Sequence, residues 1–301
     1  MCKMCEQKPV YVTQNQRKLC GSCFVKYVEK KVLKTIRVHK LINNDDAVVC
    51  AVSGGKDSLT CLYIVDKFFR KRGVEVKALL INEGIKGYRN ETLQDAEKFC
   101  RAHDISLRVV EVQKEFGRTL DAYLKKTKLM PCTACGIFRR YLINKYAREM
   151  GATKLATGHN LDDEAQSLLM NQFKGNMQLS AKLGPMTGVL MHEQFIRRIK
   201  PLYFITEKEV AIYSFIRRLP ITYIECPYYR NSLRNTVSEH LNALEHKYAG
   251  TKNGLINAFL DVLPELRKKY QHKQIGTCLS CQEPAAKELC KACELLEKAL
   301  K

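Results

Sequence analysis

The most informative segment of the chain reads Ala51-Val52-Ser53-Gly54-Gly55-Lys56-Asp57-Ser58. An apolar run over 46–52 leads into it and predicts a buried strand, and a helical pattern over 58–72 follows it. The two glycines let the backbone close around an anion, and the first amides of a helix, two hydroxyls and one ammonium group offer hydrogen bonds to it. The spacing fits neither a Walker A loop nor the dinucleotide-binding GxGxxG motif. We therefore predict a phosphate-binding loop between a strand and a helix.

Strand and helix patterns alternate beyond this loop. We expect further strands at 74–81, 105–112, 152–157 and 221–224, and helices at 91–103, 136–150 and 162–173, the last with Asn160 as its cap. Later features are an irregular segment over 174–200, a helix from a Thr206–Glu209 capping box to a point before Pro220, and two helices over 232–270 broken near Gly250. The alternation predicts an α/β fold with a parallel sheet flanked by helices, and a ligand site at the carboxyl ends of the strands.

Both ends of the chain carry cysteines in Cys-x2-Cys pairs. The sets are Cys2, Cys5, Cys20 and Cys23 at the N-terminus and Cys278, Cys281, Cys290 and Cys293 at the C-terminus. Four thiolates at this spacing suit tetrahedral zinc in a closed, structural site. We predict two Zn²⁺ sites and three parts of the chain: an N-terminal zinc module (1–27), a central catalytic domain (28–273) and a C-terminal zinc module (274–301).

The chain of 301 residues is strongly basic, with 51 Lys and Arg against 31 Asp and Glu and a formal charge of +20. Such an excess indicates a polyanionic partner, either nucleic acid or an anionic membrane surface. No stretch is apolar enough for a membrane span or a signal peptide, so we expect a cytoplasmic protein with no membrane partner. One predicted helix has a basic face that either contacts RNA or is simply solvated, formed by Lys26, Lys30, Lys34 and Arg37.

Three further cysteines lie in the middle of the chain. Cys132 and Cys135 stand in the string PCTACG directly before the helix predicted at 136–150, and Cys226 stands alone in ECPY. Helix N-termini lower the pKa of a thiol, so Cys132 and Cys135 are expected to be rich in thiolate. Their spacing leaves three interpretations open, namely a redox pair, a third zinc site or an iron–sulfur cluster. The remaining cysteines are expected to be small core residues, Cys50, Cys61 and Cys100.

The string SGGKDS after an apolar strand resembles the PP-loop of the ATP pyrophosphatases, a Rossmann-like family that cleaves ATP to AMP and pyrophosphate. With PCxxCG, ECPY, the string TGHNLDDEA over 157–165 and the terminal cysteine sets, the chain resembles the tRNA 2-thiouridine synthetases of the TtuA and NcsA family from Cys2 to Cys293. The resemblance implies that residues 51–58 bind the phosphates of ATP with Mg²⁺. The adenosine would then meet Ala51, Ile81 and Gly158 at three strand ends.

The same resemblance implies a [4Fe-4S] cluster on Cys132, Cys135 and Cys226, with one iron left open to hold the sulfur for transfer. Cys132 and Cys135 are therefore candidate catalytic residues. Arg139 stands where the family usually has a lysine, and it can contact phosphate but cannot accept a proton. Asp163 is a candidate catalytic acid, although an acid in a first helical turn is also favoured by the helix dipole alone.

The implied reaction is 2-thiolation of a tRNA uridine, in which ATP adenylates O2 of the base and sulfur displaces AMP. In the family that the chain resembles, thiolation of the T-loop uridine is associated chiefly with thermophiles, whereas the anticodon wobble uridine is modified more widely. The many Cys, Met, Asn and Gln residues of this chain are untypical of thermophiles, so we expect the wobble uridine to be the target. The resemblance also implies a homodimer and a sulfur supply from sulfide or a ubiquitin-like carrier protein. Three alternatives remain: cytidine 2-thiolation, whose enzymes lack the terminal modules, a non-catalytic RNA-binding zinc protein with a regulatory ATP site, and an ATP-dependent amide ligase.

Overall fold

The fold is centred on a parallel sheet of five strands in the order β5-β4-β3-β6-β7. The structure is a computed structural model, and it describes residues 1–2, 4–187, 192–229, 232–270 and 275–300. The strands are β3 (Ala47–Val52), β4 (Glu75–Asn82), β5 (Leu107–Glu111), β6 (Lys154–Thr157) and β7 (Arg197–Ile199). The predicted α/β class is therefore confirmed.

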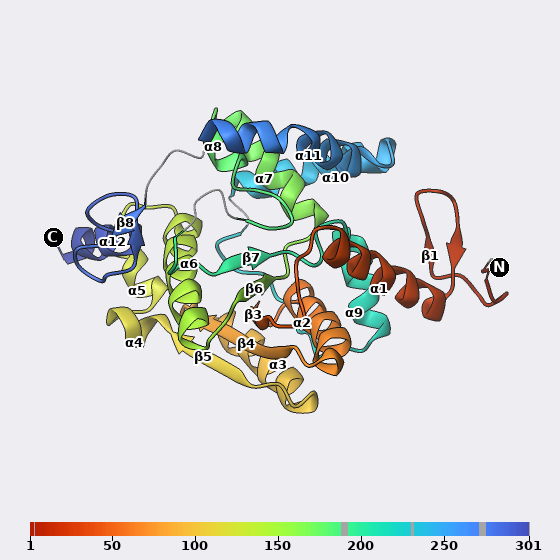
Figure 1. Cartoon of the computed structure of the whole chain (residues 1–301), viewed down its shortest axis with the longest axis horizontal. Helices are drawn as coiled ribbons and strands as arrows, with labels where there is room; N and C mark the ends of the chain where they lie inside the picture. The colour runs from red at the N-terminus through yellow and green to blue at the C-terminus, as the bar shows by residue number, and fades with distance from the viewer. Residues whose placement is uncertain (3, 188–191, 230–231, 271–274, 301) are drawn as a thin grey trace.

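Helices cover both faces of this sheet because alternate strand residues point to opposite sides. Val48 and Cys50 pack in one buried cluster with α1 (Gly21–Val38), α2 (Lys56–Phe69), α3 (Arg89–Ala102) and α9 (Glu207–Ile216). A short 3-10 helix, η1 (Arg70–Arg72), directly follows α2. Val49 packs instead with α6 (Pro131–Glu149), near the short helices α4 (Val112–Phe116) and α5 (Leu120–Leu124). A third group beyond the sheet comprises α7 (Leu161–Phe173), α8 (Met177–Ser180), α10 (Leu233–Lys247) and α11 (Thr251–Tyr270), at the top of Figure 1.

The order of the strands reverses at β3. The chain runs outward from β3 through β4 to β5, and later fills the other side with β6 and then β7. In open parallel sheets a ligand lies outside the carboxyl ends of the strands at such a reversal. The loop that follows Val52 occupies this position.

The two cysteine modules lie at opposite ends of the molecule (Figure 1). The first contains the hairpin of β1 (Tyr11–Val12) and β2 (Lys18–Leu19), and the second contains β8 (Gly276–Thr277), β9 (Pro284–Ala285) and α12 (Lys291–Leu300). α1 runs unbroken through the predicted division at residues 27 and 28. The C-terminal module packs on α5 and α6, where the Tyr123 hydroxyl donates to the Leu295 carbonyl at 3.0 Å.

Most predicted elements are confirmed within a few residues, including the Asn160 cap, the Thr206–Glu209 capping box and the break near Gly250. The strand predicted at 221–224 is wrong, because the Thr222 amide donates to the Asp95 carboxylate at 2.5 Å instead of to a strand. The segment expected to be irregular, 174–200, holds both α8 and the edge strand β7, and its residues 188–191 lie outside the described residues.

The helix predicted from residue 136 begins five residues earlier, at Pro131. Proline suits the first helical position, since its missing amide would be unpaired there in any case. Cys132 and Cys135 therefore lie inside the first turns of α6 and not before it. None of the helices that the structure describes is long and apolar enough to cross a membrane.

Candidate functional site

The loop between β3 and α2 is closed on itself by its two serines. The Ser58 hydroxyl accepts from the Ser53 amide at 3.0 Å and donates to the Gly55 carbonyl at 2.9 Å. Gly54 has φ +82°, and a Cβ there would lie 1.8 Å from the Thr92 carbonyl oxygen. The loop thus has the compact, amide-rich shape of an anion-binding turn at the N-terminus of a helix.

A cavity of about 290 Å³ opens beside this loop at the carboxyl ends of β3, β4 and β6. Its lining includes most of the residues that the sequence analysis places in the nucleotide site: Ala51, Val52, Ser53, Asp57, Ser58, Ile81, Arg139, Gly158 and Asp163. Gly54, Gly55 and Lys56 are outside this lining. Gly158 is required by the close approach of two loops, because a Cβ there would lie 2.7 Å from the backbone of Asp57.

Lys56, a predicted phosphate donor, is paired with two carboxylates of the chain. Its ammonium group pairs with Asp57 at 3.1 Å and with Glu207 at 2.8 Å. Burial opposes its charge, but these two carboxylates outweigh burial and raise the pKa of Lys56. An incoming polyphosphate would therefore compete with two carboxylates for this cation.

Five further residues line the cavity without having been selected from the sequence: Glu83, Arg89, Ile143, Thr157 and His159. Glu83 directly follows β4, so the strand-end rule that selected Ile81 could have found it. Ile143 lies one helical turn beyond Arg139 on α6, a spacing that places the two side chains on one face.

Asp163 and His159 have strongly shifted ionisation. Burial raises the pKa of Asp163 to about 6, although Arg234, 3.4 Å away, opposes the shift. Burial and the nearby cations Lys200 and Arg139 lower the pKa of His159 to about 3, so its ring is neutral near pH 7. Asp163 is therefore a cavity group that can exchange a proton near neutral pH.

Glu83 connects the nucleotide cavity to the cysteines. Its Oε2 atom pairs with Arg89 Nη2 at 2.5 Å, and both side chains are fully buried. Arg89 in turn donates from Nη1 to the Ser53 carbonyl of the phosphate-binding loop at 2.9 Å. On its other side, Glu83 Oε1 lies 3.7 Å from Arg139 Nε and 3.9 Å from Cys135 Sγ. Arg89 and Glu83 thus link the phosphate-binding loop to Cys135 through a continuous series of polar contacts.

Cys135 and Cys226 border one buried cluster, and the Cys132 thiol lies 3.9 Å from the Tyr228 carbonyl, two residues beyond Cys226. Sulfur atoms around a single tetrahedral zinc would be roughly 3.8 Å apart. Among the described residues, however, only the two terminal sets bring three or more ligand atoms within 4.8 Å of one another. The wider triad fits a multinuclear cluster better than a third zinc site.

The expected thiolate character of Cys135 is wrong for the protein without a bound metal group. Burial and the Glu83 carboxylate raise the pKa of Cys135 to about 12, and burial also raises that of Cys226. Desolvation thus outweighs the helix N-terminus. The three core cysteines are confirmed as buried, namely Cys50, Cys61 and Cys100.

Each terminal set of four cysteines brings its sulfur atoms together as a metal site requires. Cys5 Sγ is 3.2 Å from Cys20 Sγ, and Cys281 Sγ is 3.7 Å from Cys290 Sγ. The Ser22 hydroxyl lowers the pKa of Cys20 to about 6, which favours the thiolate that a metal binds. Both sets could hold a metal ion.

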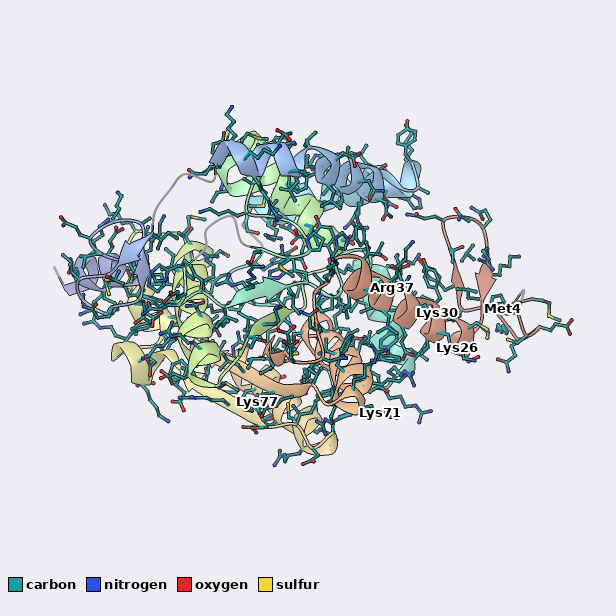
Figure 2. The ribbon with its side chains drawn as sticks, viewed as in Figure 1. Met4, Lys26, Lys30, Arg37, Lys71 and Lys77 are labelled. Atoms are coloured by element: carbon teal, nitrogen blue, oxygen red, sulfur yellow. The ribbon has the colours of Figure 1, made fainter. Side chains whose placement is uncertain are left out.

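The basic face of α1 is exposed, as predicted, and Figure 2 shows Lys26, Lys30 and Arg37 along this helix. The apolar residues of the opposite face, Val25, Val28, Val32 and Ile36, are buried. None of the four basic residues lines the cavity.

Fold, loop and cavity together define a PP-loop nucleotide-binding protein, and the family model for the PP-loop domain matches residues 26–241. A relative from Pyrococcus horikoshii, a tRNA-5-methyluridine(54) 2-sulfurtransferase, is 35% identical over 97% of this chain and 92% of its own. The tRNA 2-thiolation protein NcsA of Haloferax volcanii is 34% identical over 93% of this chain and 92% of its own.

The structure is also similar to that of the U34-tRNA thiolase NcsA from Methanococcus maripaludis with its [4Fe-4S] cluster. The TM-score is 0.84 at 32% identity, over 98% of this chain and 95% of the other. The chain belongs to the NcsA and TtuA family of PP-loop tRNA 2-thiolation proteins.

Proposed function

We propose that this chain is an ATP-dependent tRNA sulfurtransferase that converts a uridine to 2-thiouridine. The observation that carries the proposal is the placement of three cysteines beside a nucleotide cavity. Glu83 connects the two, because it lines the cavity and its Oε1 atom lies 3.9 Å from Cys135 Sγ. An RNA-binding protein with a regulatory ATP site would not need this triad. Neither would an amide ligase, which also has no use for a charge of +20.

The reaction divides into activation and substitution. The O2 atom of the uridine attacks the α-phosphorus of ATP, pyrophosphate leaves, and the N3 proton passes to a base, for which Asp163 is proposed. A hydrosulfide then adds to C2, its proton is released, the C2–O2 bond breaks and AMP leaves with the oxygen. N3 then regains a proton, and the product is 2-thiouridine.

Residues 51–58 would hold the phosphates with Mg²⁺, while Ala51, Ile81 and Gly158 would contact the adenosine and Arg139 a phosphate. The three central cysteines would hold a [4Fe-4S] cluster, and the donor set fits because its sulfurs are too far apart for one tetrahedral ion. When bound, such a cluster with one iron free of protein ligands supplies sulfur to the reaction. The terminal sets are proposed to bind one Zn²⁺ each and to be small modules flanking a catalytic domain over 28–273.

The anticodon wobble uridine is the proposed target, supported by the similarity to a U34-tRNA thiolase. The sulfurtransferase of P. horikoshii, named for position 54, supports the T-loop uridine as the second candidate. A cytoplasmic location is proposed as well, and a relative from Caenorhabditis briggsae is named a cytoplasmic tRNA 2-thiolation protein. A homodimer and a sulfide or ubiquitin-like sulfur donor are proposed from the family resemblance.

The test is an anaerobic reaction of cluster-reconstituted protein with ATP, Mg²⁺, sulfide and unmodified tRNA, followed by mass spectrometry of the nucleosides. ATP-dependent 2-thiouridine is expected, and mapping the nuclease fragments separates position 34 from position 54. The appearance of 2-thiocytidine, or of no thionucleoside with any sulfur donor, would overturn the proposal.

The cluster is tested with Cys226→Ala, with Cys100→Ala as the control. Both remove one thiol, but Cys100 is buried in the core cluster on α3 and not beside the triad. Cys226→Ala should lose bound iron, visible absorbance and thiolation while it still binds ATP. Full thiolation by Cys226→Ala would exclude the proposed cluster.

A further inference from the structure

Two arginines next to the cavity have no carboxylate partner. Arg140 lies on α6 and is exposed, and Arg198 lies on β7 and is half-buried. Among the described residues, no Asp or Glu forms an ion pair with either of them within 4.0 Å. The positions outside the described residues contain no Asp or Glu at all. No Asp or Glu carboxylate of the described residues therefore neutralises this pair, and Cys135 is the one thiol whose charge acts on Arg140.

The two side chains are held close to one another and to the cysteine site. Arg198 Nη2 donates to the Arg140 carbonyl at 3.4 Å. The guanidinium of Arg140 folds back along α6, so that its Nη1 lies 3.1 Å from where a Cβ of Gly136 would stand. Gly136 directly follows Cys135. Arg140 thus lies on the same helix as Cys132 and Cys135, and Arg198 reaches this helix from the edge strand β7.

Their charges repel each other. Burial, Arg140 and Arg139 lower the pKa of Arg198 to about 10, and burial and Arg139 lower that of Arg140. Both guanidinium groups still carry a full charge near pH 7. A bound anion would relieve the repulsion.

Other cations near the cavity are neutralised by the chain. Lys200 pairs with Glu164 at 2.6 Å, and Arg234 lies 3.4 Å from Asp163. Neither Arg140 nor Arg198 belongs to the lining of the nucleotide cavity, whereas Arg139 does. The unpaired charge is therefore located beside the ATP site and not within it.

We propose that Arg140 and Arg198 form a subsite for a backbone phosphodiester of the tRNA, next to the nucleotide that is modified. This inference rests on the proposed function, which requires the target base to lie between the cavity and the cysteines. The arginine pair, which neighbours Arg139 of the cavity lining and Gly136 after Cys135, would then be close to the phosphates that flank that base. Arginine is suited to them because its planar fork donates two parallel hydrogen bonds to a phosphate.

The test compares Arg140→Ala, Arg198→Ala and the double variant with Arg72→Ala as the control. Arg72 is also an exposed arginine, but it lies in η1 after α2, away from the cavity. Binding of an unmodified tRNA transcript to the metal-loaded protein is measured at several salt concentrations, and ATP binding is measured separately. If Arg198→Ala does not fold, the proposal is tested with two other variants, the conservative Arg198→Lys and Arg140→Glu at the exposed position.

Each alanine variant should raise the Kd for tRNA about tenfold and lower the slope of log Kd against log salt by about 0.7. Arg140→Glu should weaken tRNA binding further, and Arg198→Lys should retain most of it. ATP affinity should be unchanged, and Arg72→Ala should resemble the wild type. A loss of ATP affinity with normal tRNA binding would overturn the proposal, and so would variants that bind tRNA like Arg72→Ala.

The inference and the proposed function fail in different ways. A wild-type protein that makes 2-thiouridine, with arginine variants that bind tRNA normally, keeps the function and excludes the subsite. If the wild-type protein makes no thionucleoside but the arginine variants have a higher Kd for tRNA than Arg72→Ala, the proposed function is excluded and the phosphodiester subsite is kept.

Discussion

Asp163 is a cavity carboxyl that ionises near neutral pH. Burial raises its pKa to about 6, so the group is mostly protonated at about pH 5 and mostly ionised at about pH 7. A base must be ionised to accept a proton, so kcat/KM for thiolation should rise with pH through about 6. Asp163→Asn should lose this rise together with a factor on the order of 10² in rate. A pH–rate profile measures both, and an unchanged profile in the variant would assign the titration to another group.

Gly54 and Gly73 provide a matched pair for testing the phosphate-binding loop. Both have positive φ, +82° and +84°, but a Cβ at Gly73 meets nothing within 4 Å, whereas one at Gly54 would overlap the Thr92 backbone. Gly73→Ala should cost about 1–2 kcal/mol of unfolding free energy from backbone strain alone. Gly54→Ala should cost about 1–3 kcal/mol more and abolish ATP binding. Urea unfolding and ATP titration check this, and equal effects of the two changes would contradict it.

At the scale of elements, α6 links the central cysteines to the C-terminal module. Cys278, Cys290 and Cys293 pack in the same buried cluster as Phe138 of α6, and Cys135 borders that cluster. Arg148 of α6 also pairs with Glu283 of the module. If the module holds a metal ion as proposed, loss of that ion should therefore loosen the first turns of α6.

Cys290→Ala is accordingly expected to lose most of the iron bound by the central triad. Cys20→Ala is the control, because it breaks the other four-cysteine set, which lies at the far end of the molecule. That variant should lose its own metal but retain iron. Metal analysis of both proteins measures the effect, and equal iron contents would show that α6 holds its position without the module.

Elements with strong local signals could be predicted from the sequence. The apolar run of β3, the capping box at Thr206 and the paired cysteines each depend on neighbouring residues. β7 could not be predicted, because three residues that include Arg197 and Arg198 show no strand pattern and gain their order by pairing with β6. The contact between Glu83 and Cys135 is likewise tertiary and has no local signal.

At the scale of the whole molecule, the charge of +20 predicts tRNA binding that weakens steeply with salt. If the basic face of α1 contributes, replacing Lys26, Lys30, Lys34 and Arg37 by alanine should lower the slope of log Kd against log salt by about 3. ATP binding should be unaffected, because these residues do not line the cavity. Filter binding over a range of salt concentrations checks this, and an unchanged slope would mean that the face is only solvated.

The separation of the three central cysteines along the chain constrains when the protein can mature. Cys132 and Cys135 leave the ribosome together, but Cys226 follows only after β6, α7, β7 and α9 have been synthesised. A nascent chain that stops before residue 226 offers two of the three thiols, and the module that supports α6 emerges later still. If these three cysteines hold a cluster as proposed, the cluster cannot gain its third ligand before Cys226 has been synthesised, and nonsense truncations anywhere upstream of Cys226 would leave a protein that lacks this ligand.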